Sequence, residues 1–93
     1  MLSILAAGED EELLSQGMEY LGKFVGTIGE KYKVHVIGPA SASVGKINDI
    51  YHKVIYLKHQ DEKVLMDIKD KAEKYIEINS GFRKLYIQFD YAG

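Results

Sequence analysis

The chain has 93 residues, of which 46% are hydrophobic and 28% charged, with one proline, a composition typical of one folded domain. It has no cysteine, which excludes disulfides, thiolate nucleophiles and cysteine-based zinc sites. The lack of cysteine also favours a cytoplasmic protein. A net charge of −2 argues against a strong binder of polyanions over the whole surface, the apolar runs are too short for a membrane span, and the N-terminus does not have a signal-peptide pattern.

The first two predicted elements are a strand at Leu2–Ala7 and a helix from about Asp10 to Ile28. The strand is mostly apolar and stops at a glycine. The helix begins in an acidic run, Glu9–Glu12, which suits the positive end of a helix dipole, and its apolar residues recur at helical spacing. We expect Gly29 to end it. Three internal glycines either weaken this helix or mark a face that packs closely on a sheet: Gly17, Gly22 and Gly26.

The middle of the chain predicts a second strand at Tyr32–Ile37 and a third at Tyr51–Lys58. We expect Gly38 and Pro39 to end the second strand, because proline cannot donate a hydrogen bond to a ladder. A polar loop then runs to about Asn48 and Asp49.

A second helix is predicted after Asp61, a good N-cap, and it ends at Asn79–Gly81 before a fourth strand at Leu85–Tyr91. The order is β-α-β-β-α-β. Two right-handed crossovers in this order give a four-stranded antiparallel sheet with both helices on one face, the ferredoxin-like arrangement of the α+β class. We expect residues 1–93 to form a single domain.

Charge is distributed unevenly along the chain. Residues 1–30 have six acidic side chains and one lysine, whereas residues 31–59 have five lysines and one aspartate. His35, His52 and His59 also lie in this middle third and can add positive charge as the pH falls. The middle third is therefore a local basic region that could bind phosphate in a salt-sensitive way.

The sequence offers no recognisable catalytic pattern. Neither a P-loop nor a G-x-G-x-x-G loop occurs, so this chain alone should not hydrolyse ATP. The three histidines are too far apart in sequence for a metal motif. Ser41 and Ser43 are more typical of turn residues that bond local backbone than of nucleophiles. We predict that this chain is not itself an enzyme.

Five aromatic residues fall on predicted strands, where they could stack on bases or simply pack in the core. Tyr51 is the best candidate for base contact because His52 and Lys53 follow it. The five are Tyr51, Tyr56, Tyr86, Phe89 and Tyr91.

The segments Gly38–Ser43, Lys46–Ile47 and Tyr51–Lys58 resemble the C-terminal domain of primosomal protein N′, the PriA replication-restart helicase family. That family typically has a strand ending in Gly-Pro-Ala-Pro-Ala, a basic residue, and an Arg-Tyr-Arg-type segment that enters an apolar strand. The start of the chain, Ile4–Glu12, and its end, Ile87–Asp90, are similar to the family too. The chain departs from the family pattern at five positions: Ser41 and Ser43 replace common prolines, Ile50 and His52 common arginines, and Gln88 a common aspartate.

This resemblance implies that the chain is the C-terminal domain of a larger ATP-dependent 3′-to-5′ DNA helicase that recognises stalled replication forks and starts primosome assembly. The ATP, Mg²⁺ and zinc sites of such a protein lie in its other domains, so no cofactor is expected here. The implied fold is similar to ribosomal protein S10. The implied partners are forked or single-stranded DNA, the other helicase domains, and single-strand-binding protein with other primosome proteins.

We therefore expect a non-catalytic DNA-binding accessory domain. Two alternatives remain open: a module that docks on the helicase lobes or a partner protein without touching DNA, and an S10-like RNA binder. The expected nucleic-acid contacts are Lys46, Tyr51, His52, Lys53 and Lys58, and the loop geometry is expected to depend on Gly38, Pro39, Ser41 and Ser43.

Overall fold

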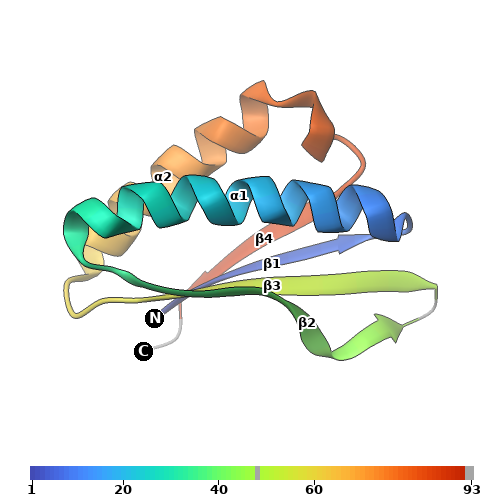
Figure 1. Cartoon of the computed structure of the whole chain (residues 1–93), viewed down its shortest axis with the longest axis horizontal. Coiled ribbons are helices and arrows are strands. Elements are labelled where there is room, and N and C mark those ends of the chain that lie inside the picture. Colours follow the sequence, from blue (N-terminus) through green and yellow to red (C-terminus); the bar gives the residue numbers. More distant parts are fainter. Residues whose placement is uncertain (48, 92–93) are drawn as a thin grey trace.

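The computed structural model describes residues 1–47 and 49–91, with the backbone alone for residues 42–47. Four strands and two helices follow one another in the predicted order (Figure 1). A single turn of 3-10 helix, Ser80–Phe82, precedes the last strand. The elements are β1 (Leu2–Gly8), α1 (Glu11–Tyr32), β2 (His35–Ile47), β3 (Ile50–Lys58), α2 (Glu62–Ile78) and β4 (Tyr86–Tyr91).

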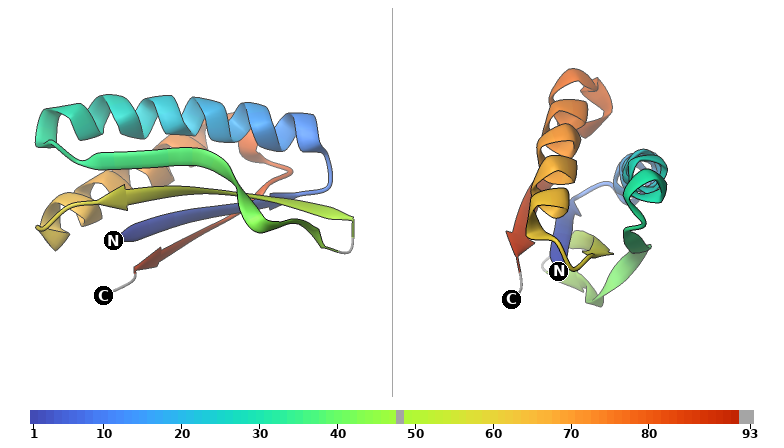
Figure 2. Two further views of the ribbon diagram at one scale, coloured as in Figure 1. Left: turned by 60° about the horizontal axis from the view of Figure 1, so that its bottom comes forward. Right: turned by 90° about the vertical axis from the view of Figure 1, so that its left-hand side faces the viewer.

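The strands form one antiparallel sheet in the order β2-β3-β1-β4. Both helices cover the same face of this sheet, and the other face is left open (Figure 2). The predicted ferredoxin-like α+β fold is confirmed. Neither helix in the described part of the chain combines the length and hydropathy that a membrane span requires.

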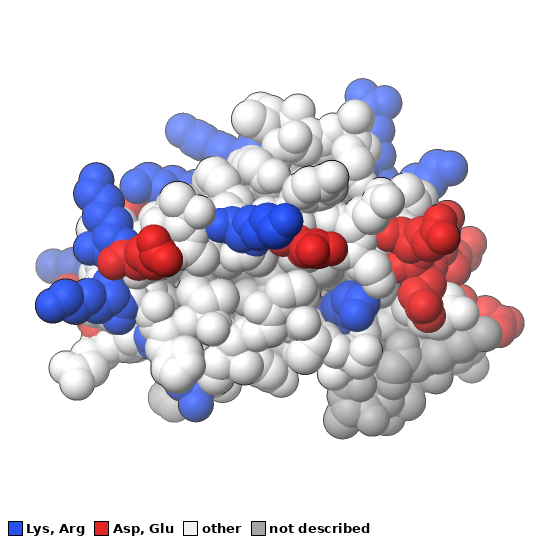
Figure 3. Space-filling model, viewed as in Figure 1, with Lys and Arg blue, Asp and Glu red and all other residues white. Residues whose placement is uncertain are grey.

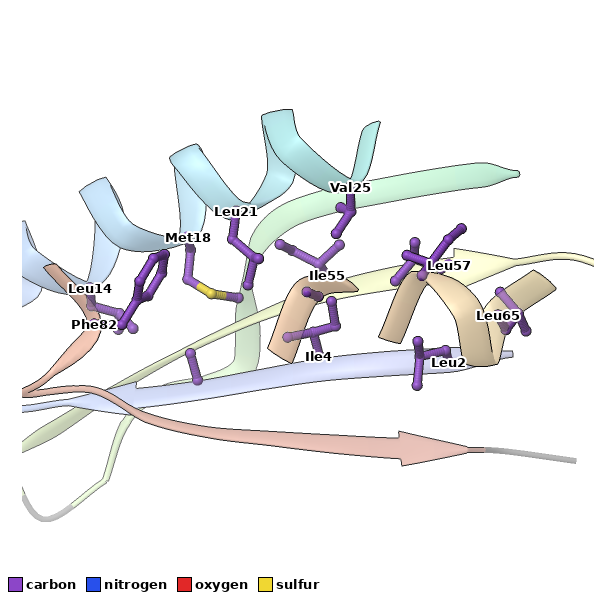
Figure 4. Close-up of a cluster of buried hydrophobic side chains, with 13 residues drawn as sticks. Leu2, Ile4, Leu14, Met18, Leu21, Val25, Ile55, Leu57, Leu65 and Phe82 are labelled. Atoms are coloured by element: carbon purple, nitrogen blue, oxygen red, sulfur yellow. The ribbon is translucent and has the colours of Figure 1, made fainter. Parts of the chain in front are cut away.

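The hydrophobic core lies between α1, α2 and the covered face of the two central strands (Figure 4). Every second residue of β1 and β3 points into it, as the strand period of two requires. Burying a side chain of leucine or isoleucine size contributes about 1.5–3 kcal/mol. The largest fully buried side chains are Leu2, Ile4, Leu14, Met18, Leu21, Val25, Ile55, Leu57, Leu65 and Ile68.

Both predicted helix starts are confirmed by side-chain caps. An Oδ1 atom of Asp10 accepts hydrogen bonds from the backbone N–H groups of Glu12 and Leu13, at 2.9 and 3.3 Å. Asp61 caps α2 in the same way by accepting from the N–H of Lys63 at 2.9 Å. Such caps each stabilise a helix by about 1 kcal/mol.

The prediction that α1 ends at Gly29 is wrong, because the helix continues to Tyr32. Gly29 is buried inside the helix, where a Cβ atom would lie 3.3 Å from a methyl group of Val36. The small residue therefore serves close packing rather than helix termination. Lys33 ends the helix in the left-handed conformation (φ 59°, ψ 40°), and the N–H of Val34 bonds back to the Gly29 carbonyl at 2.8 Å.

The prediction that Gly38 and Pro39 end the second strand is also wrong. β2 passes through this cis peptide bond and runs on to Ile47, with register shifts between Ile37 and Ala40 and again between Ser41 and Lys46. Proline is tolerated because β2 is an edge strand and the shifts remove the need for a regular ladder there. The expected loop is therefore largely an irregular strand.

Gly38 is needed at its position for two reasons. Its φ angle of 99° lies in the region that favours glycine, and a Cβ atom there would lie 2.8 Å from the carbonyl oxygen of Val54. This supports the predicted role of Gly38 in the local backbone geometry.

The helix glycines give a matched test of packing. A Cβ atom on Gly22 would lie 2.9 Å from the Pro39 ring, whereas one on Gly26 would meet nothing within 4 Å. We expect Gly26→Ala to raise the free energy of unfolding by about 0.5–1 kcal/mol, as helix propensity predicts. Gly22→Ala should lower it by about 1–3 kcal/mol, because α1 and β2 must move apart. Urea unfolding of both variants measures this, and equal effects would contradict the proposed contact.

Candidate nucleic-acid interface

The predicted contact residues lie at two separate ends of β3. Tyr51, His52 and Lys53 are near its start, whereas Lys58 is its last residue. Lys58 lies five positions after Lys53 along the extended strand, which corresponds to roughly 17 Å. The backbone of Lys46 on β2 pairs with Tyr51, and its side chain lies outside the described part of the structure. The five residues therefore do not form one compact patch.

The start of β3 adjoins the acidic start of α1. Lys53 lines a recess of about 300 Å³ together with Glu11, Ser15, Ser41 and Tyr51. Acidic side chains gather at this end of the molecule (Figure 3). A phosphate placed at Lys53 would therefore also feel the field of Glu11, which weakens attraction at this end.

The opposite end of the sheet is basic. Lys33 follows α1, Lys58 ends β3 and His59 follows it, and all three line one hollow of about 500 Å³. Lys31 occupies the last turn of α1, and His35 pairs with Lys58 in the sheet register. Basic side chains predominate at this end in Figure 3. We call these five residues the basic end: Lys31, Lys33, His35, Lys58 and His59.

His59 holds the basic end together. Its Nδ1 atom accepts a hydrogen bond from the N–H of Asp61 at 2.9 Å, and its Nε2 atom lies 3.1 Å from the carbonyl oxygen of Tyr32. An Nδ1 atom that accepts leaves the ring proton on Nε2, which then donates to Tyr32. The ring thus ties the β3–α2 turn to the end of α1, and so fixes Lys58 relative to Lys33.

The lysines near this end differ in whether a carboxylate of the protein already pairs with them. Lys71 of α2 contacts Asp67 at 3.1 Å and lies 5.8 Å from the centre of the Tyr32 ring. The hydrogen bond and charge of Asp67 raise the pKa of Lys71 above its usual value. Within residues 1–47 and 49–91, neither Lys33 nor Lys58 forms an ion pair. These two cations are therefore the ones best placed to meet an external anion.

The aromatic candidates separate by exposure. Tyr51 is half-buried and packs against the core, as does Phe89. Tyr56 is half-buried on the open face, and Tyr91 is 44% exposed. Tyr86, at the start of β4, is 72% exposed and is the most accessible strand aromatic in the described part of the chain. Of the five rings, Tyr86 rather than Tyr51 is best placed for base stacking.

Sequence reasoning missed Lys33 and His59 as contact residues. Both were visible in the charge distribution of the middle third, but 25 positions separate Lys33 from Lys58 in the printed sequence. Only the left-handed cap of α1 and the β2–β3 register bring them together. Among the loop residues, Ser41 lies on the exposed part of β2 and pairs with Lys53, and the side chain of Ser43 lies outside the described part.

Comparisons with known proteins establish the fold and nothing finer. No protein-family model matches the chain, and no curated protein matches it either. A solved structure of a protein named as an amidohydrolase/peptidase, from Burkholderia cenocepacia, is similar over 99% of this chain with a TM-score of 0.60. The identity is 11%, and the chain spans about a quarter (27%) of that protein. At this identity the likeness concerns the fold alone.

The role of His59 can be tested by removing both of its hydrogen bonds. We expect His59→Leu to lower the free energy of unfolding by about 1–2 kcal/mol, because it leaves the half-buried contact to Tyr32 unmade. The adjacent exposed residue provides the control, and Gln60→Leu should change stability by less than about 0.5 kcal/mol. The midpoint of urea unfolding, compared at an unchanged m-value, measures both effects. A similar loss of stability in the two variants would argue against a specific link through the imidazole.

Proposed function

We propose that this domain binds single-stranded or forked DNA through its basic end, as a non-catalytic accessory domain. The observation that supports this best is the convergence of Lys33 and Lys58 on one hollow beside His59. Within the part of the chain that the structure describes, neither lysine has a carboxylate partner, so the two present a positive potential to an approaching phosphate. Contacts of this kind position a nucleic acid without reading its sequence, so structure-specific rather than sequence-specific binding is expected.

The uneven distribution of charge over the molecule supports one location for the bound strand. Acidic side chains lie at the start of α1 and basic ones at its end (Figure 3). A polyanion would therefore cross the basic end and avoid the helix start. The net charge of −2 implies moderate affinity that falls with salt.

The sequence resemblance extends this proposal to a parent protein. We propose that the domain belongs to a cytoplasmic, ATP-dependent replication-restart helicase of the PriA type, in which the ATP, Mg²⁺ and zinc sites lie in other domains. Its partners would then be a stalled fork, the helicase lobes, single-strand-binding protein and other primosome proteins. The departures at Ile50 and His52 move the expected phosphate contact away from the start of β3 and toward Lys58.

A second candidate is docking on the other domains of the same helicase without contact to DNA. The uncovered face of the sheet favours it, because that face exposes apolar side chains of β1, β2 and β4. Leu5, Ile37 and Tyr86 are 36%, 39% and 72% exposed. Side chains of this kind on an open face are typical of protein contacts.

The first experiment is fluorescence anisotropy with labelled forked DNA, single-stranded DNA and RNA at two salt concentrations. We expect DNA to bind and the affinity to fall with salt. The slope of the logarithm of the binding constant against the logarithm of the salt concentration reports the number of phosphate contacts. For single strands, Lys33→Gln together with Lys58→Gln should reduce the magnitude of this slope by about 1.4, at roughly 0.7 per lost contact.

Two matched double variants complete the test. Lys46→Gln with Lys53→Gln removes the same charge from the β2–β3 hairpin, which we call the hairpin end, and should weaken DNA binding less. Lys23→Gln with Lys74→Gln removes it from the outer faces of the helices and should leave binding unchanged. Binding that survives loss of the basic end but not of the hairpin end would refute the proposed location. No binding at low salt would favour the docking role, and tighter binding to RNA would favour the S10-like one.

A further inference from the structure

The strand β4 forms one edge of the sheet, so within residues 1–47 and 49–91 no strand pairs with its outer side (Figure 2). An edge strand leaves a row of backbone N–H and C=O groups that can pair with a further strand. β4 pairs with β1 over six consecutive residues, from Tyr86 to Tyr91, without a register shift. A regular edge of this kind is suited to the addition of another strand.

The opposite edge of the sheet, β2, is built differently. It contains Pro39 and shifts its register against β3 at two places. Proline and bulges are common means by which an edge strand is kept from pairing with another chain. β4 has neither of these, and its six residues include no lysine. Of the two edges, β4 is therefore the one that is open to pairing.

Large apolar side chains lie exposed along the β4 edge. Tyr86 and Tyr91, the first and last residues of the strand, are both exposed. The Nζ atom of Lys69 lies 5.9 Å from the ring centres of both Phe89 and Tyr91, so this flank of α2 lies over β4. Met66 precedes Lys69 by three residues, shares its flank and is 55% exposed. Exposed side chains of this size beside an unpaired edge are typical of a protein contact.

The side chains of β4 alternate between the two faces of the sheet. Ile87 and Phe89 are half-buried on the face that the helices cover, whereas Tyr86, Gln88 and Asp90 are exposed on the open face. A second copy related by a twofold axis keeps both faces continuous only if residues of the same face are paired. With Gln88 on the axis, Ile87 meets Phe89 of the second copy on the covered face. Tyr86 then meets Asp90 of the second copy on the open face.

The charges near β4 fit the same antiparallel arrangement. Asp90 is the one charged residue of the strand, and Arg83 and Lys84 lie in the turn that precedes it. Antiparallel pairing places the basic turn of each copy beside Asp90 of the other. The two Gln88 amides meet at the axis, where each can donate to and accept from the other. A parallel, in-register copy would instead place Asp90 opposite Asp90, which is unfavourable.

We propose that β4 pairs with β4 of a second copy of this chain, antiparallel and with Gln88 on the twofold axis, so that one continuous sheet spans the dimer. Because β2 is irregular, the assembly closes as a dimer and does not grow into a filament. The inference goes beyond the proposed DNA binding and does not depend on it, since the β4 edge and the basic end have no residue in common.

The test begins with sedimentation equilibrium of the unmodified chain over a range of concentrations. We expect the apparent mass to rise from 10.5 kDa toward twice that value. Gln88→Lys should raise the dissociation constant about fivefold, because it places like charges directly opposite each other at an exposed position. Gln88→Glu should do the same, and an equal mixture of these two variants should associate more tightly than either alone. Ser41→Lys, on the exposed part of β2, is the control and should leave association unchanged.

The geometry can be tested by cross-linking, because the chain has no cysteine of its own. Gln88→Cys should cross-link rapidly with a short bifunctional thiol reagent, since the two Cβ atoms would lie about 4.5–5.5 Å apart. Asp90→Cys should cross-link far more slowly, because its two thiols would be roughly 14 Å apart along the paired strands. Ser41→Cys reports on the opposite edge and should also be slow.

Each outcome supports or overturns the proposal. A chain that remains a single copy at every concentration would overturn it, as would association that Gln88→Lys leaves unchanged. Cross-linking that is fastest through Ser41→Cys would place the contact at the other edge, and cross-linking fastest through Asp90→Cys would refute the axis at Gln88. Tighter association in the mixture of Lys and Glu variants supports the proposal and excludes misfolding as the cause of their weaker self-association.

Discussion

The antiparallel register of β1 between β3 and β4 is the constraint on which the other features depend. Leu2 pairs with Leu57 on one side and Tyr91 on the other, and from there each residue of β1 has a fixed pair of neighbours. A slip by one residue would turn Leu2 and Ile4 away from the helices and expose the core face to water. Because the buried side fixes the register, it also decides which residues meet on the open side.

The same register separates an acidic end of the domain from a basic end. The ends of α1 lie near opposite ends of the sheet, so its acidic first turn adjoins the start of β3 and its basic last turn adjoins the end (Figure 1). The cavity lined by Glu9 and Asp10 lies at the acidic end, and the hollow lined by Lys33 and Lys58 lies at the basic end.

The sequence predicted the fold well because its signals are local. The apolar strand segments, the helical apolar stripe, the acidic start of the first helix and the N-cap at Asp61 each depend on a few neighbouring residues. The two boundary errors arose where tertiary structure decides: Gly29 is buried against Val36, and Pro39 sits on an edge strand. The candidate site was harder to predict, because the convergence of Lys33 with Lys58 comes from strand pairing that no local pattern encodes.

The pairing of Leu2 with Tyr91 has a mechanical consequence. The first residues of β1 and the last residues of β4 lie side by side at the same end of the sheet (Figure 2). Tension applied between these two ends would load the β1–β4 hydrogen bonds one after another, in the manner of a zipper, rather than shearing them together. A pull between the two ends of this domain would thus peel β4 away at low force, while a pull on one end alone would displace the domain as a rigid body.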